Sequence, residues 1–441
     1  MTHSTTIYAL SSAAGRAGVS VIRISGPEAK SFLQQCTEKK DFLPRQATLT
    51  AIIDPQSRET LDQAIIIFFP APHSFTGEDV VELHVHGSLA VIQDVLQTLS
   101  NLQNYHLAAA GEFSKRAFHN NKMDLTEIEG LADLIESETS LQRRQALQQM
   151  SGQLRQLYEE WRHKIIRILA LTEAQIDFID EELPDDLLGL IFKDIADIQQ
   201  QIQNHLNDDH KGERLRSGFH IALIGPPNAG KSSLLNILAK RDIAIVSPYE
   251  GTTRDLLEAH LDIAGYPVIF VDTAGIRETS NPIEKEGIKR SIERAEQADI
   301  VMRLVEATHI KTPHDIPSPK KKNEWIIINK TDVKPLSITT IPPHTWCISA
   351  ATGAGIQNLI CGIKDELNLN YNPSHGYITR TRYRTSLENC LQNLSEIYSE
   401  QDIELIAENL RLACRALDQI MGKVRVDDLL DVIFKEFCIG K

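Results

Sequence analysis

The chain has 441 residues, of which 42% are hydrophobic and 24% are charged, and its formal net charge is −14. That length predicts about three domains, each with its own core, and the composition is typical of a globular protein. No apolar run approaches the roughly 18 residues of a membrane-spanning helix, and no signal-peptide pattern opens the chain. The acidic balance excludes a general positive field, so a nucleic-acid partner must meet a local basic surface.

Residues 1–118 read as a mixed α+β domain. Strands are predicted at residues 19–24, 64–69 and 80–86, followed by an amphipathic helix over 88–99. The period of a strand places Glu82, His84 and His86 on one face, opposite Val81, Leu83 and Val85. A polar face of this kind is consistent with a bound ligand. A metal is not expected, because no third ligand accompanies the two histidines.

The helical pattern covers residues 119–215 and returns over 373–441. One apolar stripe runs from Leu147 to Ile168, and a second runs from Leu188 to Leu206 beyond Pro184. Thr126 and Glu129 are interpreted as a capping box that begins this region. The simplest arrangement is one helical domain interrupted by an inserted domain at 216–372.

A cluster of basic and aromatic residues begins the second helical segment. It comprises Arg380, Arg382 and Arg384 with Tyr377 and Tyr383. Arginines contact phosphate and tyrosines stack on bases, so the cluster is a candidate RNA surface. An ordinary solvated helix start is the alternative.

The inserted segment opens with the most specific motif of the chain. Residues 225–232, Gly-Pro-Pro-Asn-Ala-Gly-Lys-Ser, lie between a buried-strand pattern at 219–224 and a helical pattern at 233–240. Glycines let backbone N–H groups surround a phosphate chain, Lys231 neutralises the outer phosphates and Ser232 can hold Mg²⁺. This arrangement predicts a nucleoside triphosphate site.

Further motifs follow in order and identify the base. Thr252 and Thr253 stand in a polar loop, and residues 272–275, Asp-Thr-Ala-Gly, follow an apolar strand. Asn-Lys-Thr-Asp at 329–332 follows another strand, and Ser349-Ala350 follows a third. A carboxylate at Asp332 can accept from the N1–H and 2-amino groups of guanine, whereas adenine offers neither donor. The motifs together predict a GTPase. Arg303 interrupts a further apolar strand at 299–305 without an evident reason.

The position after Gly275 holds Ile276, where many switch GTPases have a glutamine that orients water. Glu284 is a candidate to orient or activate the water, although Asn281, Pro282 and Glu284 also match a helix start. Arg277 either reaches the phosphates or pairs with a carboxylate. The loop at 247–253 offers carbonyl oxygens near Asn228, a donor set suited to a monovalent cation.

The motifs resemble the MnmE (TrmE) family along essentially the whole chain. The resemblance rests on residues 15–19 with 23–26, residues 74–87, residues 111–118 with 122–125, and the ending Phe-Cys-Ile-Gly-Lys at 437–441. It implies an N-terminal α+β domain (1–118) that binds tetrahydrofolate and dimerises. A helical domain (119–215 and 373–441) and an inserted Ras-like P-loop GTPase domain (216–372) complete the expected α+β and α/β architecture.

The resemblance also assigns residues to cofactors. Folate contacts fall on Arg23, Glu82, Lys122 and Lys441, Mg²⁺ ligands on Ser232 and Thr253, and K⁺ ligands on Asn228, Ser247, Tyr249 and Thr252. Glu284 corresponds to the water-activating acid, and Cys438 is either a thiolate near the folate or an anchor for the tail. The implied GTP-binding residues are Asn228, Ala229, Gly230, Lys231, Ser232, Ser233, Ser247, Pro248, Tyr249, Glu250, Gly251, Thr252, Thr253, Asp272, Thr273, Ala274, Gly275, Asn329, Lys330, Asp332, Ser349 and Ala350.

The family's reaction supplies the expected function. A homodimer works in a heterotetramer-like complex with MnmG (GidA), which carries FAD, and installs an aminomethyl or carboxymethylaminomethyl group at carbon 5 of the wobble uridine (U34) of tRNA. The one-carbon unit comes from 5,10-methylene-tetrahydrofolate, and 5-formyl-tetrahydrofolate is a second folate expected at the site. Scattered cysteines without a Cys-x-x-Cys pair indicate a cytoplasmic protein. A ribosome-assembly GTPase and a plain P-loop ATPase remain the alternatives.

Overall fold

The computed structural model describes residues 5–177, 187–240, 258–272, 298–319, 323–335, 341–367, 376–400 and 402–424, together with 433 and 440. The chain divides into two compact units. One unit comprises residues 1–132, 149–195 and 392–441, and the other comprises 133–148 and 196–391. Within the described residues, no helix is both long and apolar enough to cross a membrane.

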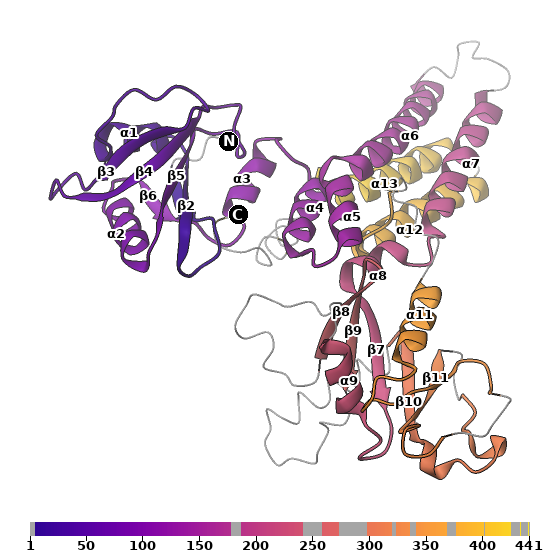
Figure 1. Cartoon of the computed structure of the whole chain (residues 1–441). Coiled ribbons are helices and arrows are strands. Elements are labelled where there is room, and N and C mark those ends of the chain that lie inside the picture. The colour runs from indigo at the N-terminus through magenta and orange to yellow at the C-terminus, as the bar shows by residue number, and fades with distance from the viewer. Residues whose placement is uncertain are drawn as a thin grey trace, which may run out of the picture. The chain divides into compact units, whose positions relative to one another are not determined.

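The first unit opens with a mixed sheet (Figure 1). Its strand order is β3-β4-β5-β2-β1-β6, and every neighbouring pair is antiparallel except β1 with β6. The strands are β1 (Thr6–Leu10), β2 (Ala17–Ser25), β3 (Thr48–Ile53), β4 (Thr60–Phe69), β5 (Val80–Gly87) and β6 (Tyr105–Leu107). The helices of this region are α1 (Ala29–Cys36), α2 (Leu89–Ser100) and α3 (Glu112–His119).

One face of this sheet is packed by α1 and α2. Ile22 and Ile24 of β2 and Val81, Leu83 and Val85 of β5 belong to that core. Glu82 and His84 are partly exposed and His86 is exposed, so the alternation predicted for β5 is confirmed. The helix predicted at 88–99 begins where expected, because the Ser88 hydroxyl accepts from the backbone N–H of Val91.

The helical elements are α4 (Leu125–Glu136), α5 (Ser140–Met150), α6 (Gln153–Asp177), α7 (Leu187–Leu206), α8 (Lys211–Ser217), α12 (Thr381–Glu396) and α13 (Ile403–Met421). In the first unit, α6 and α13 pack side by side (Figure 1). Arg162 of α6 pairs with Asp418 of α13 at 2.5 Å. Thus segments from before and after the predicted insertion share one packed layer.

Two predictions for the helices were wrong. The capping box is formed by Asp124 and Glu127, not by Thr126 and Glu129, because each side chain accepts from the other residue's backbone N–H. The first apolar stripe is not continuous. Gly152 adopts a left-handed φ of 86° between α5 and α6, and Leu147 is 41% exposed.

The second unit contains a second sheet, with the order β12-β11-β10-β7-β9-β8. The strands β7 (Phe219–Ile224), β9 (Tyr266–Asp272), β10 (Ile300–Glu306), β11 (Glu324–Asn329) and β12 (Thr345–Cys347) are parallel, and β8 (Glu258–Ile263) is antiparallel to β9. The helices α9 (Lys231–Ala239) and α11 (Ile356–Leu367) contribute to the core on one face. Short 3₁₀ helices cover Ala307–His309 and Pro313–Asp315 in this unit, and Ile397–Ser399 in the first unit.

β11 is buried on both faces, as expected for an inner parallel strand. The polar residue that interrupts β10 has a structural reason. Arg303 Nε lies 2.5 Å from Glu324 Oε1, and Glu324 is only 2% exposed. A buried carboxylate is costly unless it is paired, so Arg303 provides its counter-charge.

Candidate functional site

The phosphate loop lies between β7 and α9. Gly225 has φ 148°, and a Cβ there would stand 2.5 Å from the carbonyl oxygen of Leu304. Gly230 has φ 95°, and its Cβ would stand 2.2 Å from Asn329 Nδ2. Both positions therefore require glycine. The loop ends at the N-terminus of α9, whose backbone N–H groups and dipole favour an anion.

Lys231 lies across this loop. Its Nζ donates to the carbonyl oxygens of Gly225 at 2.8 Å and Pro226 at 3.0 Å, and the residue is 5% exposed. Ser232 and Ser233 in the first turn of α9 are exposed, as is Asn228, which has φ 63°. The loop thus brings an ammonium group, hydroxyl groups and an amide to one helix start.

Asn329 connects the phosphate loop to the loop after β12. Its Nδ2 donates to the carbonyl oxygen of Ala229 at 2.8 Å, and its Oδ1 accepts from the backbone N–H of Ala350 at 3.0 Å. Ser349 supports this second loop by accepting from Thr352 N–H at 3.1 Å. The side chain of Asn329 therefore fixes both loops relative to each other.

The remaining residues of this motif have different environments. Lys330 has φ 64°, and its Nζ lies 2.7 Å from Glu306 Oε1, a hydrogen bond that holds the pKa of Glu306 below its usual value. Asp332 is exposed. Its carboxylate is therefore accessible to a base at the carboxyl ends of the parallel strands, where ligands of such sheets bind.

In the first unit, Arg23 and Glu82 are neighbours on paired strands. Arg23 Nε and Nη2 lie 3.1 and 3.0 Å from Glu82 Oε1, and both side chains are about one-fifth exposed. The other oxygen, Oε2, is 3.6 Å from His84 Nε2. The guanidinium carbon of Arg23 is 5.3 Å from the ring centre of Phe75 and 5.7 Å from that of Phe113.

Lys122 contacts the segment that carries Phe75. Its Nζ donates to the carbonyl oxygen of Pro72 at 3.0 Å. The methylene groups of its side chain pass so close to Gly77 that a Cβ at that position would stand 3.2 Å from them. Gly440 is held at the end of β1, where Ser11 Oγ donates to its carbonyl oxygen at 2.9 Å. The structure thus brings Arg23, Glu82 and Lys122 to the surroundings of one loop, residues 72–78.

Several predicted residues lie outside the described part of the chain, and for Asp272 only the backbone is described. They are Glu284, Arg277, Cys438, Lys441, Ser247, Pro248, Tyr249, Glu250, Gly251, Thr252, Thr253, Thr273, Ala274 and Gly275.

Most of the candidate RNA surface at the start of α12 is engaged within the protein, and the Arg382 guanidinium lies 4.4 Å from the ring centre of Tyr383. Arg384 Nη2 is 2.6 Å from Asp208 Oδ1, and Arg380 Nη2 is 3.0 Å from Asp133 Oδ1. Tyr377 and Tyr383 are buried, so neither can stack on a base. Asp133 also accepts from Arg216 Nε at 2.9 Å. These arginines therefore hold the end of α4, α8 and the start of α12 together within the second unit.

Sequence reasoning did not single out Arg116, which lies within the third family signature. Its side chain is buried, and it pairs with Glu78 and Glu112. The available signal was an arginine four residues after a glutamate on a short helix beside apolar residues.

A phosphate loop, a guanine-accessible carboxylate and separate α+β and helical regions together define a multidomain P-loop GTPase. A model of the "GTP-binding protein TrmE N-terminus" matches residues 6–122, and a model of the "MnmE helical domain" matches residues 125–438. The chain belongs to the MnmE family of tRNA modification GTPases. The recognition and the fold class predicted from the sequence are confirmed.

Curated relatives support this assignment over the full length. The tRNA modification GTPase MnmE of Parvibaculum lavamentivorans is 50% identical over 99% of this chain and 100% of its own length. That of Rickettsia akari is 45% identical with the same coverage. The FeoB G domain of Methanococcus jannaschii is 28% identical where it matches, covering 34% of this chain and 97% of its own, with a TM-score of 0.23.

Proposed function

We propose that this chain is a K⁺-dependent GTPase that modifies the wobble uridine of certain tRNAs. With an FAD-dependent partner of the MnmG (GidA) type, it would add an aminomethyl or carboxymethylaminomethyl group to C5 of U34, using a one-carbon tetrahydrofolate. The observation that carries the proposal is that one chain of the MnmE family combines the Asn329-linked phosphate loop with the Arg23–Glu82 pair. Relatives with full-length similarity are named tRNA modification GTPases.

The nucleotide site has a suitable donor set for GTP. Asp332 would accept from the two N–H donors of guanine, and Ser349-Ala350 would border the base. Lys231 would exchange its bonds to Gly225 and Pro226 for bonds to the β- and γ-phosphates. The hydroxyls of Ser232 and Thr253 would hold Mg²⁺, which would supply positive charge against the phosphates.

The cation site is proposed from its oxygen donors. Asn228 is exposed in the phosphate loop, and its amide oxygen with the carbonyls of Ser247, Tyr249 and Thr252 would hold K⁺. A monovalent cation there supplies positive charge at the position where other GTPases use an arginine. Glu284 would orient the attacking water, and Arg277 would contact the phosphates.

The folate site is proposed on the first sheet. Glu82 Oε1 accepts from Arg23, and Oε2 would accept from a pterin N–H and amino group. Arg23, Lys122 and Lys441 would meet the negative charge of the folate's glutamate tail. The charges and hydrogen-bonding groups of these residues fit such a ligand, and Cys438 would stand beside it.

The organisation follows from the same proposal. We assign the folate-binding and dimerisation domain to 1–118, the helical domain to 119–215 and 373–441, and the GTPase domain to 216–372. The functional state would be a cytoplasmic homodimer that binds MnmG in a heterotetramer-like complex.

A comparison of salts tests the proposal. GTP hydrolysis by the full chain should fall at least about a hundredfold when KCl is replaced by NaCl at equal ionic strength. The smaller Na⁺ would not be held by the same oxygen ligands, and the charge then missing from this position is worth about 10³–10⁵ in rate. GTP affinity should stay unchanged. Equal rates in both salts would contradict the cation proposal.

A further inference from the structure

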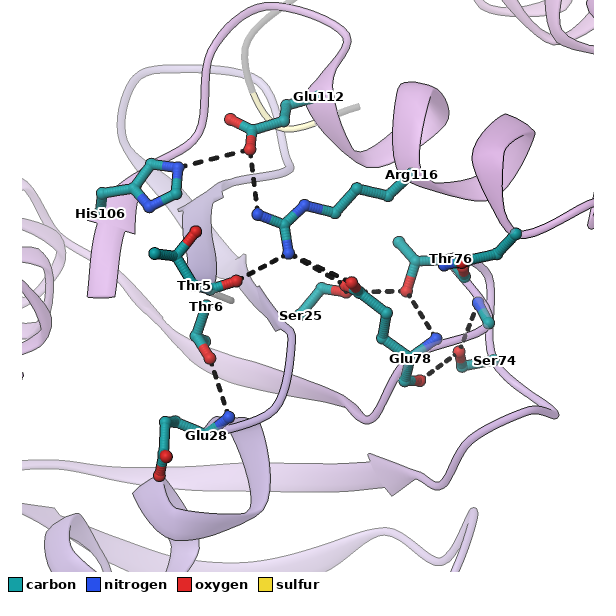
Figure 2. Close-up of polar contacts among 12 residues, drawn as sticks. Thr5, Thr6, Ser25, Glu28, Ser74, Thr76, Glu78, His106, Glu112 and Arg116 are labelled. Atoms are coloured by element: carbon teal, nitrogen blue, oxygen red, sulfur yellow. Dashed lines mark hydrogen bonds and ion pairs between the residues drawn. The ribbon is translucent and has the colours of Figure 1, made fainter. Parts of the chain in front are cut away.

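Arg116 of α3 is a buried cation with hydrogen-bond partners on both terminal nitrogens of its guanidinium group (Figure 2). It is 2% exposed. Its Nη1 donates to the carbonyl oxygen of Thr5 at 2.9 Å and lies 3.2 Å from Glu78 Oε2, and its Nη2 donates to Glu112 Oε1 at 3.0 Å. Glu112 also accepts from Ala109 N–H. Two carboxylates therefore converge on one guanidinium.

Glu78, which pairs with Arg116, is the last residue of the loop at residues 72–78 and is connected to it by hydrogen bonds. Its Oε2 accepts from Ser25 Oγ at 2.7 Å, and its backbone N–H donates to Thr76 Oγ1 at 3.2 Å. Ser74 Oγ donates to the carbonyl oxygen of Glu78 at 2.5 Å, and Asn120 donates to that of Thr76 at 2.7 Å. Figure 2 shows these contacts running from Arg116 through Glu78 to Ser74. The loop is thus fixed by side chains buried beneath it.

The same loop supplies one of two aromatic rings beside Arg23. Phe75 belongs to the loop, and Phe113 lies on α3 three residues before Arg116. The Arg116–Glu78 pair therefore joins the two elements that carry these rings. Both rings lie beside the Arg23 guanidinium that contacts Glu82.

We propose that Arg116 is a positioning residue for the folate site, acting through Glu78 and Phe75 on Arg23. This inference rests on the proposed folate function and deepens it. Neither Arg116 nor Glu78 contacts the ligand in this account. Their bonds instead pre-organise the cation that does, which is how residues beneath a site set its affinity.

The two carboxylates offer a matched pair of variants. Glu78→Gln and Glu112→Gln each remove one charge next to Arg116 and leave it one carboxylate. Only Glu78 is connected to the loop. The measurement is the Kd of the full chain for 5-formyl-tetrahydrofolate by calorimetry, with the melting temperature of each variant recorded beside it.

We expect Glu78→Gln to weaken folate binding by about tenfold or more, as one lost charge-assisted hydrogen bond allows. Glu112→Gln should change the Kd by less than about threefold at a similar melting temperature. In a Phe75→Leu background, Glu78→Gln should have little further effect, because both act on the same contact. Equal losses in the two carboxylate variants, or losses that follow melting temperature, would overturn the inference.

Folate binding by the wild-type protein and by Arg23→Ala distinguishes a failure of the positioning role from a failure of the proposed folate function. If the wild type does not bind the folate, the folate proposal itself fails. If the wild type binds and Arg23→Ala does not, while Glu78→Gln behaves like Glu112→Gln, only the positioning role of Arg116 is wrong.

Discussion

Asn329 donates a hydrogen bond of 2.8 Å to the carbonyl oxygen of Ala229, which joins the motif expected to read the base directly to the phosphate loop. Replacing Asn329 by Ala leaves this buried carbonyl and the N–H of Ala350 without their partner. Each such loss costs about 1–3 kcal/mol, so the affinities for GTP and GDP should both fall by about tenfold or more. Fluorescent nucleotide titration measures this, and unchanged affinities would show that the two loops hold their positions independently.

Asp332 is predicted to select the base. Asp332→Asn removes the acceptor for the guanine N1–H and 2-amino group and introduces a donor. GTP affinity should fall by more than about a hundredfold, and xanthosine triphosphate should bind more tightly than GTP, because its 2-oxo group accepts from an amide. Competition binding with both nucleotides decides this. Retained GTP preference would contradict base selection by Asp332, whereas comparable hydrolysis of ATP and GTP by the wild type would support the alternative of a plain P-loop ATPase.

Glu284 has two interpretations that one pair of variants separates. Glu284→Ala removes both the carboxylate and any helix cap, whereas Glu284→Gln keeps the capping ability. If the Glu284 carboxylate activates the water as a general base, both variants should lose turnover by about 10²–10⁴ while GTP affinity is kept. Single-turnover hydrolysis is the measurement. Normal turnover in Glu284→Gln would exclude a general-base role, and normal turnover in both variants would leave helix capping as the role of the residue.

Asp124 makes α4 sensitive to pH. Its Oδ1 accepts from Glu127 N–H, whereas its Oδ2 is buried without a partner among the described residues. Burial raises the pKa of Asp124 to about 6, against the capping bonds that lower it. A carboxyl group whose pKa is raised by folding favours the folded state at low pH, and this contribution is lost as pH rises through about 6.

Between pH 4 and pH 7, the free energy of unfolding of α4 should therefore fall by up to about 3 kcal/mol more in the wild type than in Asp124→Asn. The asparagine keeps the Oδ1 acceptor of the cap and does not titrate. Amide hydrogen exchange across α4, corrected for intrinsic rates, reports the difference. A difference in the exchange protection of α4 between the two proteins that does not change with pH would contradict the prediction.

The inserted sheet was largely predictable because its strands are short apolar runs that end at recognisable motifs. The strand expected at 219–224 coincides with β7, and the strand expected at 299–305 agrees with β10 within one residue, whereas β8 was not predicted. Buried parallel strands leave little choice of position, and the loops that follow them carry the motif residues. The chemistry of Lys231 and Asp332 therefore follows from spacing alone.

The helical region was less predictable because short-range patterns have close alternatives. Asp124–Glu127 and Thr126–Glu129 both fit a capping pattern, and only the hydrogen bonds distinguish them. The arginines of α12 resembled a phosphate-binding surface because their partners Asp133 and Asp208 are distant in sequence. Tertiary pairing of this kind, like that of Arg303 with Glu324, leaves no local signal.

Mass spectrometry of bulk tRNA from cells that lack this gene tests the central proposal most directly. The account predicts that aminomethyl-type groups at C5 of the wobble uridine disappear, and that the wild-type gene restores them whereas an Asp332→Asn copy does not. Wobble uridines that keep their full modification in the deletion strain would contradict it.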